Sequence, residues 1–172
     1  SVTQLVHKFF EPFDAVVIAN RCKKYATPGS KYYAKTTEDI LQEWKENTLQ
    51  GTYMHAAIEE YFNSDIETQN SIILHPEKYG NLEKIMPLLK QLKPYRTEWL
   101  IYDQELDIAG SIDYVAQNEK TGKFWIIDWK RCKDKFKYTS YDKKYGKGPC
   151  SHLPDCNATH YNLQVNIYRD RK

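Results

Sequence analysis

The sequence has no long apolar run and too few cysteines for a disulfide-rich framework. A membrane-spanning helix needs about 18 or more consecutive apolar residues, and no stretch approaches that length. Four cysteines in 172 residues favour reduced thiols over structural disulfides. We therefore expect no membrane partner and an intracellular location.

The sequence also has little net charge, +2 over the whole chain, which by itself does not indicate nucleic-acid binding. The charge is unevenly distributed, however, because residues 130–147 are rich in Lys and Arg with tyrosines among them. This composition is typical of a surface that contacts a phosphate backbone and unstacked bases, and a solvated loop is the alternative. The residues are Lys130, Arg131, Lys133, Lys135, Lys137, Tyr138, Tyr141, Lys143, Lys144, Tyr145 and Lys147.

The chain does not begin with Met, and a helical pattern runs to its last residues without a terminator. Its length lies within the usual range of one domain, roughly 50–250 residues. We therefore expect residues 1–172 to be a single domain cut from a longer protein.

Hydrophobic periodicity predicts helices around a central sheet. The strongest helical pattern covers 51–62, and a second covers 160–170. Residues 63–80 and 132–158 are polar and are expected to be loops. Consecutive strands are expected at 97–103, 106–117 and 123–130. This order predicts an α+β or α/β domain with a central mixed β-sheet flanked by helices.

Two carboxylates and a lysine mark the last two predicted strands. Asp113 lies in "GSIDYV", and Asp128 lies in "IIDWK", two residues before Lys130 on the same strand face. A hairpin would bring Asp113 and Asp128 close together, and a hard divalent cation such as Mg²⁺ or Mn²⁺ would remove their repulsion. Lys130 would then stabilise negative charge or orient a water nucleophile. The alternative is an ordinary Asp–Lys ion pair at a strand end.

The helix at 51–62 offers further candidate ligands. His55 and Glu59 are four residues apart and so share a helix face, from which either could complete a metal site. Glu60 and Glu98 are alternative acids.

The last predicted helix carries polar groups suited to a substrate. Gln164 and Tyr168 are four residues apart, and Tyr161 lies one turn earlier. Together they could present an amide and two hydroxyls to a phosphate or a base. Tyrosines packed in the core with a polar tip are the alternative.

These motifs together resemble the PD-(D/E)XK nuclease superfamily, in its RecB-like branch. The resemblance covers about residues 51–168 in the expected order. The matching motifs are "GTYMH" with His55, "GSIDYV" with Asp113, "IIDWK" with Asp128 and Lys130, and "YNLQVNIY" with Gln164 and Tyr168.

The resemblance implies a restriction-endonuclease-like core that hydrolyses DNA phosphodiester bonds with Mg²⁺ or Mn²⁺, in an exonuclease-like manner on single-stranded ends. The implied partner besides nucleic acid is a helicase or polymerase region of the same longer chain. Lys130 would be the catalytic lysine, and Glu59 would correspond to the family's helix acid, although Glu60 and Glu98 stay open. The implied metal ligands are His55, Asp113, Asp128 and the backbone carbonyl of Trp129, and the implied substrate contacts are Gln164, Tyr168 and Tyr161.

The cysteines depart from one family pattern and match no common zinc pattern. Some RecB-like nucleases hold an iron–sulfur cluster with three late cysteines, but here the last cysteines precede the Gln–Tyr helix, so no cluster is expected. The spacing of the cysteines and histidines at 150–160 favours an ordered loop with buried thiols over a zinc site. These residues are Cys150, His152, Cys156 and His160.

Two other functions stay open at this point. Viral cap-snatching endonuclease domains also combine a His, two acids and a Lys, and they cut RNA. Gly110 in "AGSID" and the Gln–Tyr helix favour the RecB-like interpretation. The second alternative is a non-catalytic nucleic-acid-binding module with the same fold.

Overall fold

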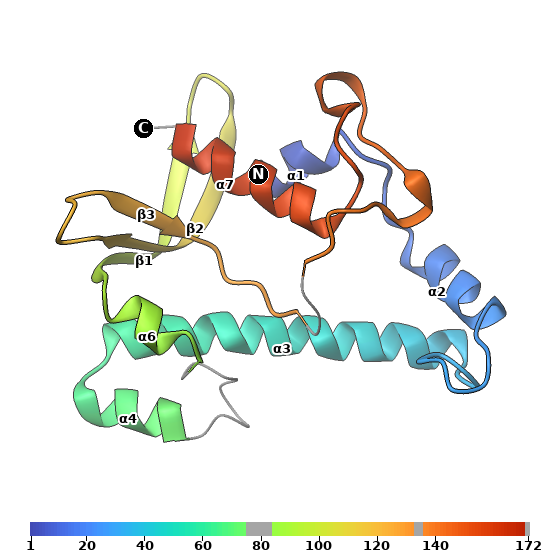
Figure 1. The fold of residues 1–172 in the computed structure, drawn as a ribbon, viewed down its shortest axis with the longest axis horizontal. Helices are drawn as coiled ribbons and strands as arrows, with labels where there is room; N and C mark the ends of the chain where they lie inside the picture. Colours follow the sequence, from blue (N-terminus) through green and yellow to red (C-terminus); the bar gives the residue numbers. More distant parts are fainter. Residues whose placement is uncertain (75–83, 133–135, 171–172) are drawn as a thin grey trace. The chain divides into compact units, whose positions relative to one another are not determined.

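The computed structural model describes residues 1–74, 84–132 and 136–170 (Figure 1). The chain divides into two compact units, Pro12–Thr52 and the remainder. The long helix α3 (Thr37–Asn63) contributes to both. No helix within the described residues is long and apolar enough to cross a membrane.

The smaller unit contains α2 (Ala15–Lys24) and the first half of α3. Asp14 caps α2 by accepting a hydrogen bond from the first turn at 3.0 Å. Glu43 on α3 forms ion pairs with Lys31 and Lys35 at 2.8 and 2.6 Å, and these hydrogen bonds lower the pKa of Glu43 to about 2. The ion pairs therefore fasten the segment before α3 to that helix.

The larger unit is built on a three-stranded antiparallel sheet in the order β1 (Lys93–Asp103), β2 (Ile108–Gln117), β3 (Phe124–Ile127). Gly122 closes the β2–β3 turn with a φ of 69°, which glycine adopts without the steric cost of a Cβ. The α+β class and the flanking helices agree with the prediction. The parallel pairing of the expected mixed sheet does not occur among the described strands.

Helices cover one face of this sheet through an apolar cluster. The second half of α3 contributes Ala57, Ile58 and Tyr61, and α4 (Ile66–Leu74) and α6 (Met86–Leu89) pack against the same cluster. The sheet side supplies Tyr114, Ala116 and Trp129. This packing fixes α3 against Tyr114 and Ala116 of β2, next to the middle of the strand, where the candidate site lies.

The opposite face is covered by α1 (Val2–His7) and α7 (Asn157–Asp170), which lie on the side of the sheet away from α3 (Figure 1). Val2 and Tyr168 pack against Ile112 and Val115 of β2. The larger unit is therefore a sheet held between two layers of helices.

Helix α4 corrects the prediction of a loop over 63–80, of which 75–80 lie outside the described residues. Asp65 accepts a hydrogen bond from the Thr68 backbone at 2.9 Å, as an N-cap does, and Ile72 is buried in the cluster beside α3. A segment predicted as a loop thus forms a helix that begins at a cap and buries Ile72. The predicted 132–158 loop is largely irregular where it is described, with short 3₁₀ turns at Tyr141–Lys143 (η2) and Gly148–Cys150 (η3).

Candidate metal centre

Three acidic residues are cross-strand neighbours, so they lie in one row, or level, across the sheet. The β1–β2 register pairs Thr97 with Tyr114 and Trp99 with Ile112, so Glu98 lies opposite Asp113. The β2–β3 register pairs Tyr114 with Ile127, and its continuation places Asp128 opposite Asp113 on the other side. Cross-strand neighbours at this level approach within about 5 Å, so carboxylates there interact strongly. The central acid of the row is Asp113.

The sheet is irregular at this level. Glu98 has a φ of 43°, in the left-handed region that non-glycine residues rarely adopt. Such a conformation costs on the order of 1–3 kcal/mol and persists only where surrounding contacts enforce it. The strict face alternation predicted for β2 also breaks, since Ile112 and Val115 lie in the same apolar cluster. The distortion turns the side chains of Glu98 and Asp113 toward α3.

Asp113 is a buried carboxylate with one strong backbone donor. The backbone N–H of Trp129 donates to its Oδ2 at 2.7 Å. Burial, followed by the nearby negative charge of Asp128, raises the pKa of the Asp113 carboxyl, and the Trp129 N–H and the His55 ring oppose this shift. The ionised form of Asp113 is therefore incompletely compensated by the protein alone.

The position of the His55 ring follows from a single hydrogen bond. Its Nε2 lies 2.9 Å from the backbone carbonyl oxygen of Trp129. A carbonyl oxygen accepts only, so Nε2 must carry the proton of that bond. In the neutral imidazole, Nδ1 then holds a lone pair, and it faces Asp113 Oδ2 at 3.5 Å and Glu98 Oε1 at 3.9 Å. Both separations exceed ordinary N–H···O distances.

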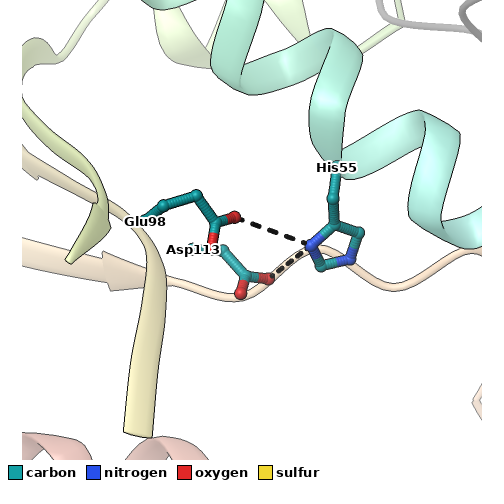
Figure 2. Close-up of side chains that lie close together, drawn as sticks. All are labelled: His55, Glu98 and Asp113. Carbon is teal, nitrogen blue, oxygen red and sulfur yellow. Dashed lines mark ion pairs between the residues drawn. The ribbon is translucent and has the colours of Figure 1, made fainter. Parts of the chain in front are cut away.

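Figure 2 shows how these three side chains converge, with His55 reaching down from α3 and the two carboxylates coming from the sheet. One ligand atom from each lies within 4.8 Å of the other two. Adjacent ligands around an octahedral Mg²⁺ are about 3 Å apart, given metal–oxygen bonds of roughly 2.1 Å. Small side-chain movements would bring the group to that spacing. An imidazole nitrogen with two carboxylate oxygens could hold a divalent cation: the oxygens suit Mn²⁺ or Mg²⁺, and the nitrogen also suits Zn²⁺ or Fe²⁺.

Glu98 is held in place by a neighbour that the sequence did not single out. The hydroxyl of Ser111 donates to Glu98 Oε2 at 3.0 Å and leaves Oε1 directed at His55. The signal available in the sequence was the hydroxyl in "GSID", two residues before Asp113. Such a hydrogen bond, made to the carboxylate oxygen that does not face His55, orients a metal-binding carboxylate.

Asp128 is fixed by a separate set of contacts just beyond the end of β3. Lys130 Nζ lies 2.6 Å from Asp128 Oδ2, and the Gln164 amide donates to Asp128 Oδ1 at 3.2 Å. The same amide donates to the Tyr168 hydroxyl at 3.3 Å. Lys130 also lies over the Tyr161 ring, 5.1 Å from its centre. The polar groups predicted on α7 therefore all contact the Asp128–Lys130 pair, directly or through Gln164.

Gly110 allows α7 to approach the sheet closely. A Cβ at this position would lie 2.8 Å from both Cε1 and the hydroxyl oxygen of Tyr168, which is closer than real Cβ contacts allow. The glycine in "AGSID" thus has a packing reason, because it admits the Tyr168 ring beside β2. Burial, above all, raises the pKa of the Tyr168 hydroxyl.

The structure brings together most of the predicted site residues. His55 and Asp113 converge, and Asp128 is paired with Lys130. The Trp129 carbonyl, expected as a metal ligand, instead contacts Nε2 of His55, the ring nitrogen that does not face Asp113. Asp128 stands outside the three-residue ligand group found among the described residues.

The acid that joins His55 and Asp113 in the ligand group is Glu98. Glu59 and Glu60 are exposed on α3 and do not belong to that group. Of the three acids that the sequence left open, the geometry therefore selects the one on β1.

The cysteine and histidine residues at 150–160 do not form a ligand group among the described residues. Cys150 is buried in an apolar cluster, Cys156 contacts the Thr159 hydroxyl at 3.3 Å, and His160 pairs with Asp155 at 3.0 Å.

Comparison with known proteins supplies no relative, since no family model, no curated protein and no solved structure matches the chain.

Proposed function

We propose that this chain is a Mg²⁺- or Mn²⁺-dependent nuclease that hydrolyses DNA phosphodiester bonds, as the resemblance to the RecB-like branch of the PD-(D/E)XK superfamily implies. The observation that carries the proposal is the orientation of His55. Its Nε2 is committed to the Trp129 carbonyl, so its Nδ1 faces two carboxylates. That arrangement is repulsive unless a cation lies between the three groups or the ring carries a second proton.

The raised pKa of Asp113 supports a cation as the missing partner. Burial and the charge of Asp128 both disfavour the ionised form of Asp113 in the metal-free protein. A bound Mg²⁺ or Mn²⁺ would offset this charge, and it would supply Lewis-acid polarisation of a phosphate oxygen and an acidified water. His55, Glu98 and Asp113 would hold the ion, and the Trp129 carbonyl would keep the His55 ring oriented through its hydrogen bond.

Asp128 and Lys130 would perform the remaining tasks. Lys130 holds its ammonium 2.6 Å from Asp128, in a position to stabilise charge that develops on a phosphate or to orient the attacking water. The Gln164 amide fixes the second oxygen of Asp128. DNA is proposed over RNA because Gly110 in "AGSID" and the Gln–Tyr helix favour the RecB-like resemblance.

A cleavage assay tests the proposal. The substrates are end-labelled single-stranded DNA, duplex DNA, RNA and a circular single strand, each with Mn²⁺, with Mg²⁺ and with EDTA. Asp128→Asn and Lys130→Ala are compared with Asp107→Asn, which changes an exposed carboxylate outside the ligand group. We expect metal-dependent DNA cleavage by the wild type and the control variant, and its loss in the two site variants.

The circular substrate separates endonuclease from exonuclease activity, and we expect it to resist cleavage. Preference for RNA in Mn²⁺ would favour the cap-snatching alternative. Metal binding without cleavage of any substrate would contradict the proposed reaction and favour a non-catalytic module.

A further inference from the structure

Exposed aromatic rings and lysines lie together in the segment that joins β3 to α7. Phe136, Tyr138 and Tyr145 are 45%, 65% and 54% exposed. Lys137, Lys143 and Lys144 are exposed among them. Exposed aromatic side chains that occur together with lysines are typical of surfaces that contact bases and phosphates, whereas single exposed aromatics are ordinary. We call these six residues the aromatic–lysine surface.

This surface is connected to the candidate metal centre by direct contacts. The Phe136 ring meets the Tyr161 ring edge to face, with centres 5.6 Å apart. Lys130 lies over that same Tyr161 ring at 5.1 Å, and it pairs with Asp128. The Phe136 end of the aromatic–lysine surface is therefore linked to the Asp128–Lys130 pair through the Tyr161 ring.

The other end of the surface is fixed by backbone hydrogen bonds. Tyr145 pairs with Pro154 in an antiparallel bridge, and Gly146 donates to the Leu153 carbonyl at 3.0 Å. Lys147 donates to the Phe9 carbonyl at 2.6 Å. The Tyr145 ring is thus exposed on a restrained backbone, so little conformational freedom is lost when a flat group stacks on it.

We propose that the aromatic–lysine surface binds single-stranded nucleic acid, with bases stacked on the aromatic rings and phosphates beside the lysines. This inference rests on the proposed nuclease function and assigns its strand selectivity to this surface. Base faces are accessible only in an unpaired strand, so a stacking surface discriminates against duplex. Lys147 is not included, because its ammonium is already paired with Glu11.

The first experiment measures binding without cleavage. A labelled oligothymidine of about 20 nucleotides is titrated in EDTA and followed by fluorescence anisotropy. Stacking on one aromatic ring contributes enough that Tyr145→Ala should weaken binding by about 5-fold to 100-fold. Tyr145→Phe should bind like the wild type, because the ring remains. Tyr25→Ala, at a tyrosine that is 68% exposed in the smaller unit, is the matched control and should have no effect.

The salt dependence tests the lysines separately. For single strands, log K decreases as log salt increases, and the steepness of this decrease is reduced by about 0.7 for each phosphate contact removed. Lys143→Gln combined with Lys144→Gln should reduce the steepness of this salt dependence by about 1.4. Lys120→Gln, at an exposed lysine of the β2–β3 turn, should leave it unchanged. Duplex DNA of the same length should bind more weakly and should not respond to Tyr145→Ala.

The two proposals fail in different ways. If Tyr145→Ala binds single strands as the wild type does while cleavage continues, the surface is not the binding site and the nuclease function stands. If the binding changes occur as expected but nothing is cleaved, the surface stands and the nuclease function is wrong. Tight duplex binding that responds equally to Tyr145→Ala would overturn the single-strand assignment. An RNA strand of equal length identifies which nucleic acid is the substrate, through its cleavage.

Discussion

Asp113→Asn should uncouple the stability of this protein from divalent metal. Asn keeps the size of the side chain, and its Oδ1 can accept the Trp129 N–H that now donates to Asp113 at 2.7 Å. The substitution removes only the buried negative charge. We therefore expect metal-free Asp113→Asn to be at least as stable as the wild type at neutral pH.

The sign of the pH dependence follows from the direction of the Asp113 pKa. The fold raises the pKa of this carboxyl above its value in the unfolded chain, which is about 3.9. Its contribution to stability is therefore fully present below about pH 3.9, where the carboxyl is protonated in both the folded and the unfolded protein. That stability is lost as pH rises through the folded pKa, because the buried group must then ionise. Asp113→Asn should lack this loss, and thermal melts in EDTA from pH 4 to neutrality would measure the difference.

Metal should reverse the order of the two proteins. At a free metal concentration of 100 times Kd, binding stabilises the folded state by about 2.7 kcal/mol. For a protein of this size, each kcal/mol raises Tm by roughly 2–4 °C, so the wild type should gain about 5–10 °C. Asp113→Asn should gain almost nothing, because it loses the central ligand of the group. Calorimetric titration with Mn²⁺ supplies the Kd, and Asp107→Asn controls for a carboxylate removed from the surface.

Two results would refute this reasoning. If Asp113→Asn keeps the full metal-dependent rise in Tm, Asp113 is not a ligand. If the metal-free variant is several degrees less stable than the wild type across the pH range, the carboxylate forms a stabilising ion pair with His55, and no cation is needed to explain the site.

Three further substitutions have expected outcomes. Gly110→Ala should destabilise the protein by about 1–3 kcal/mol in denaturant unfolding and reduce cleavage, because its Cβ would lie 2.8 Å from Tyr168. Gly51→Ala, with open space around the new Cβ, should instead stabilise α3 by about 0.5–1 kcal/mol. Glu98→Gln should weaken Mn²⁺ binding in calorimetry and Glu59→Gln should not, and the reverse result would return the metal-site acid to α3. Lys130→Ala should lower the cleavage rate by about 100-fold or more with Mn²⁺ affinity kept, since its ammonium pairs with Asp128 and stands outside the ligand group; weakened metal binding would mean that it positions the ligands instead.

The sequence was sufficient for the parts of the site that depend on strand order. The motifs "GSIDYV" and "IIDWK" predicted neighbouring antiparallel strands, and the observed β2–β3 register brings Asp113 and Asp128 to one level. The helix at 51–62 was equally readable from its apolar spacing, and it lies within α3. Regular periodicity carries this information because it fixes which face each side chain occupies.

The sequence was insufficient where the backbone departs from regular geometry. Strict alternation along "TEWLIYD" says nothing of a left-handed residue at Glu98, so Glu59, Glu60 and Glu98 could not be separated. The polar segment before residue 75 likewise concealed α4, whose burial depends on Ile72. Both features result from packing against elements that are distant in sequence, and no local pattern encodes that packing.

The distorted level of the sheet has a cost that a purely structural role would not require. Glu98 adopts an unfavourable backbone conformation, and the pKa of Asp113 is raised by burial first and then by the charge of Asp128. A chain selected for stability alone would replace either acid with an apolar residue of similar size, as the central position of β2 permits. The presence of both, with the His55 Nδ1 directed between them, is expected when stability is given up to preorganise ligands for a cation. The metal-dependent rise in Tm and its loss in Asp113→Asn would therefore test the proposed cation site from two sides.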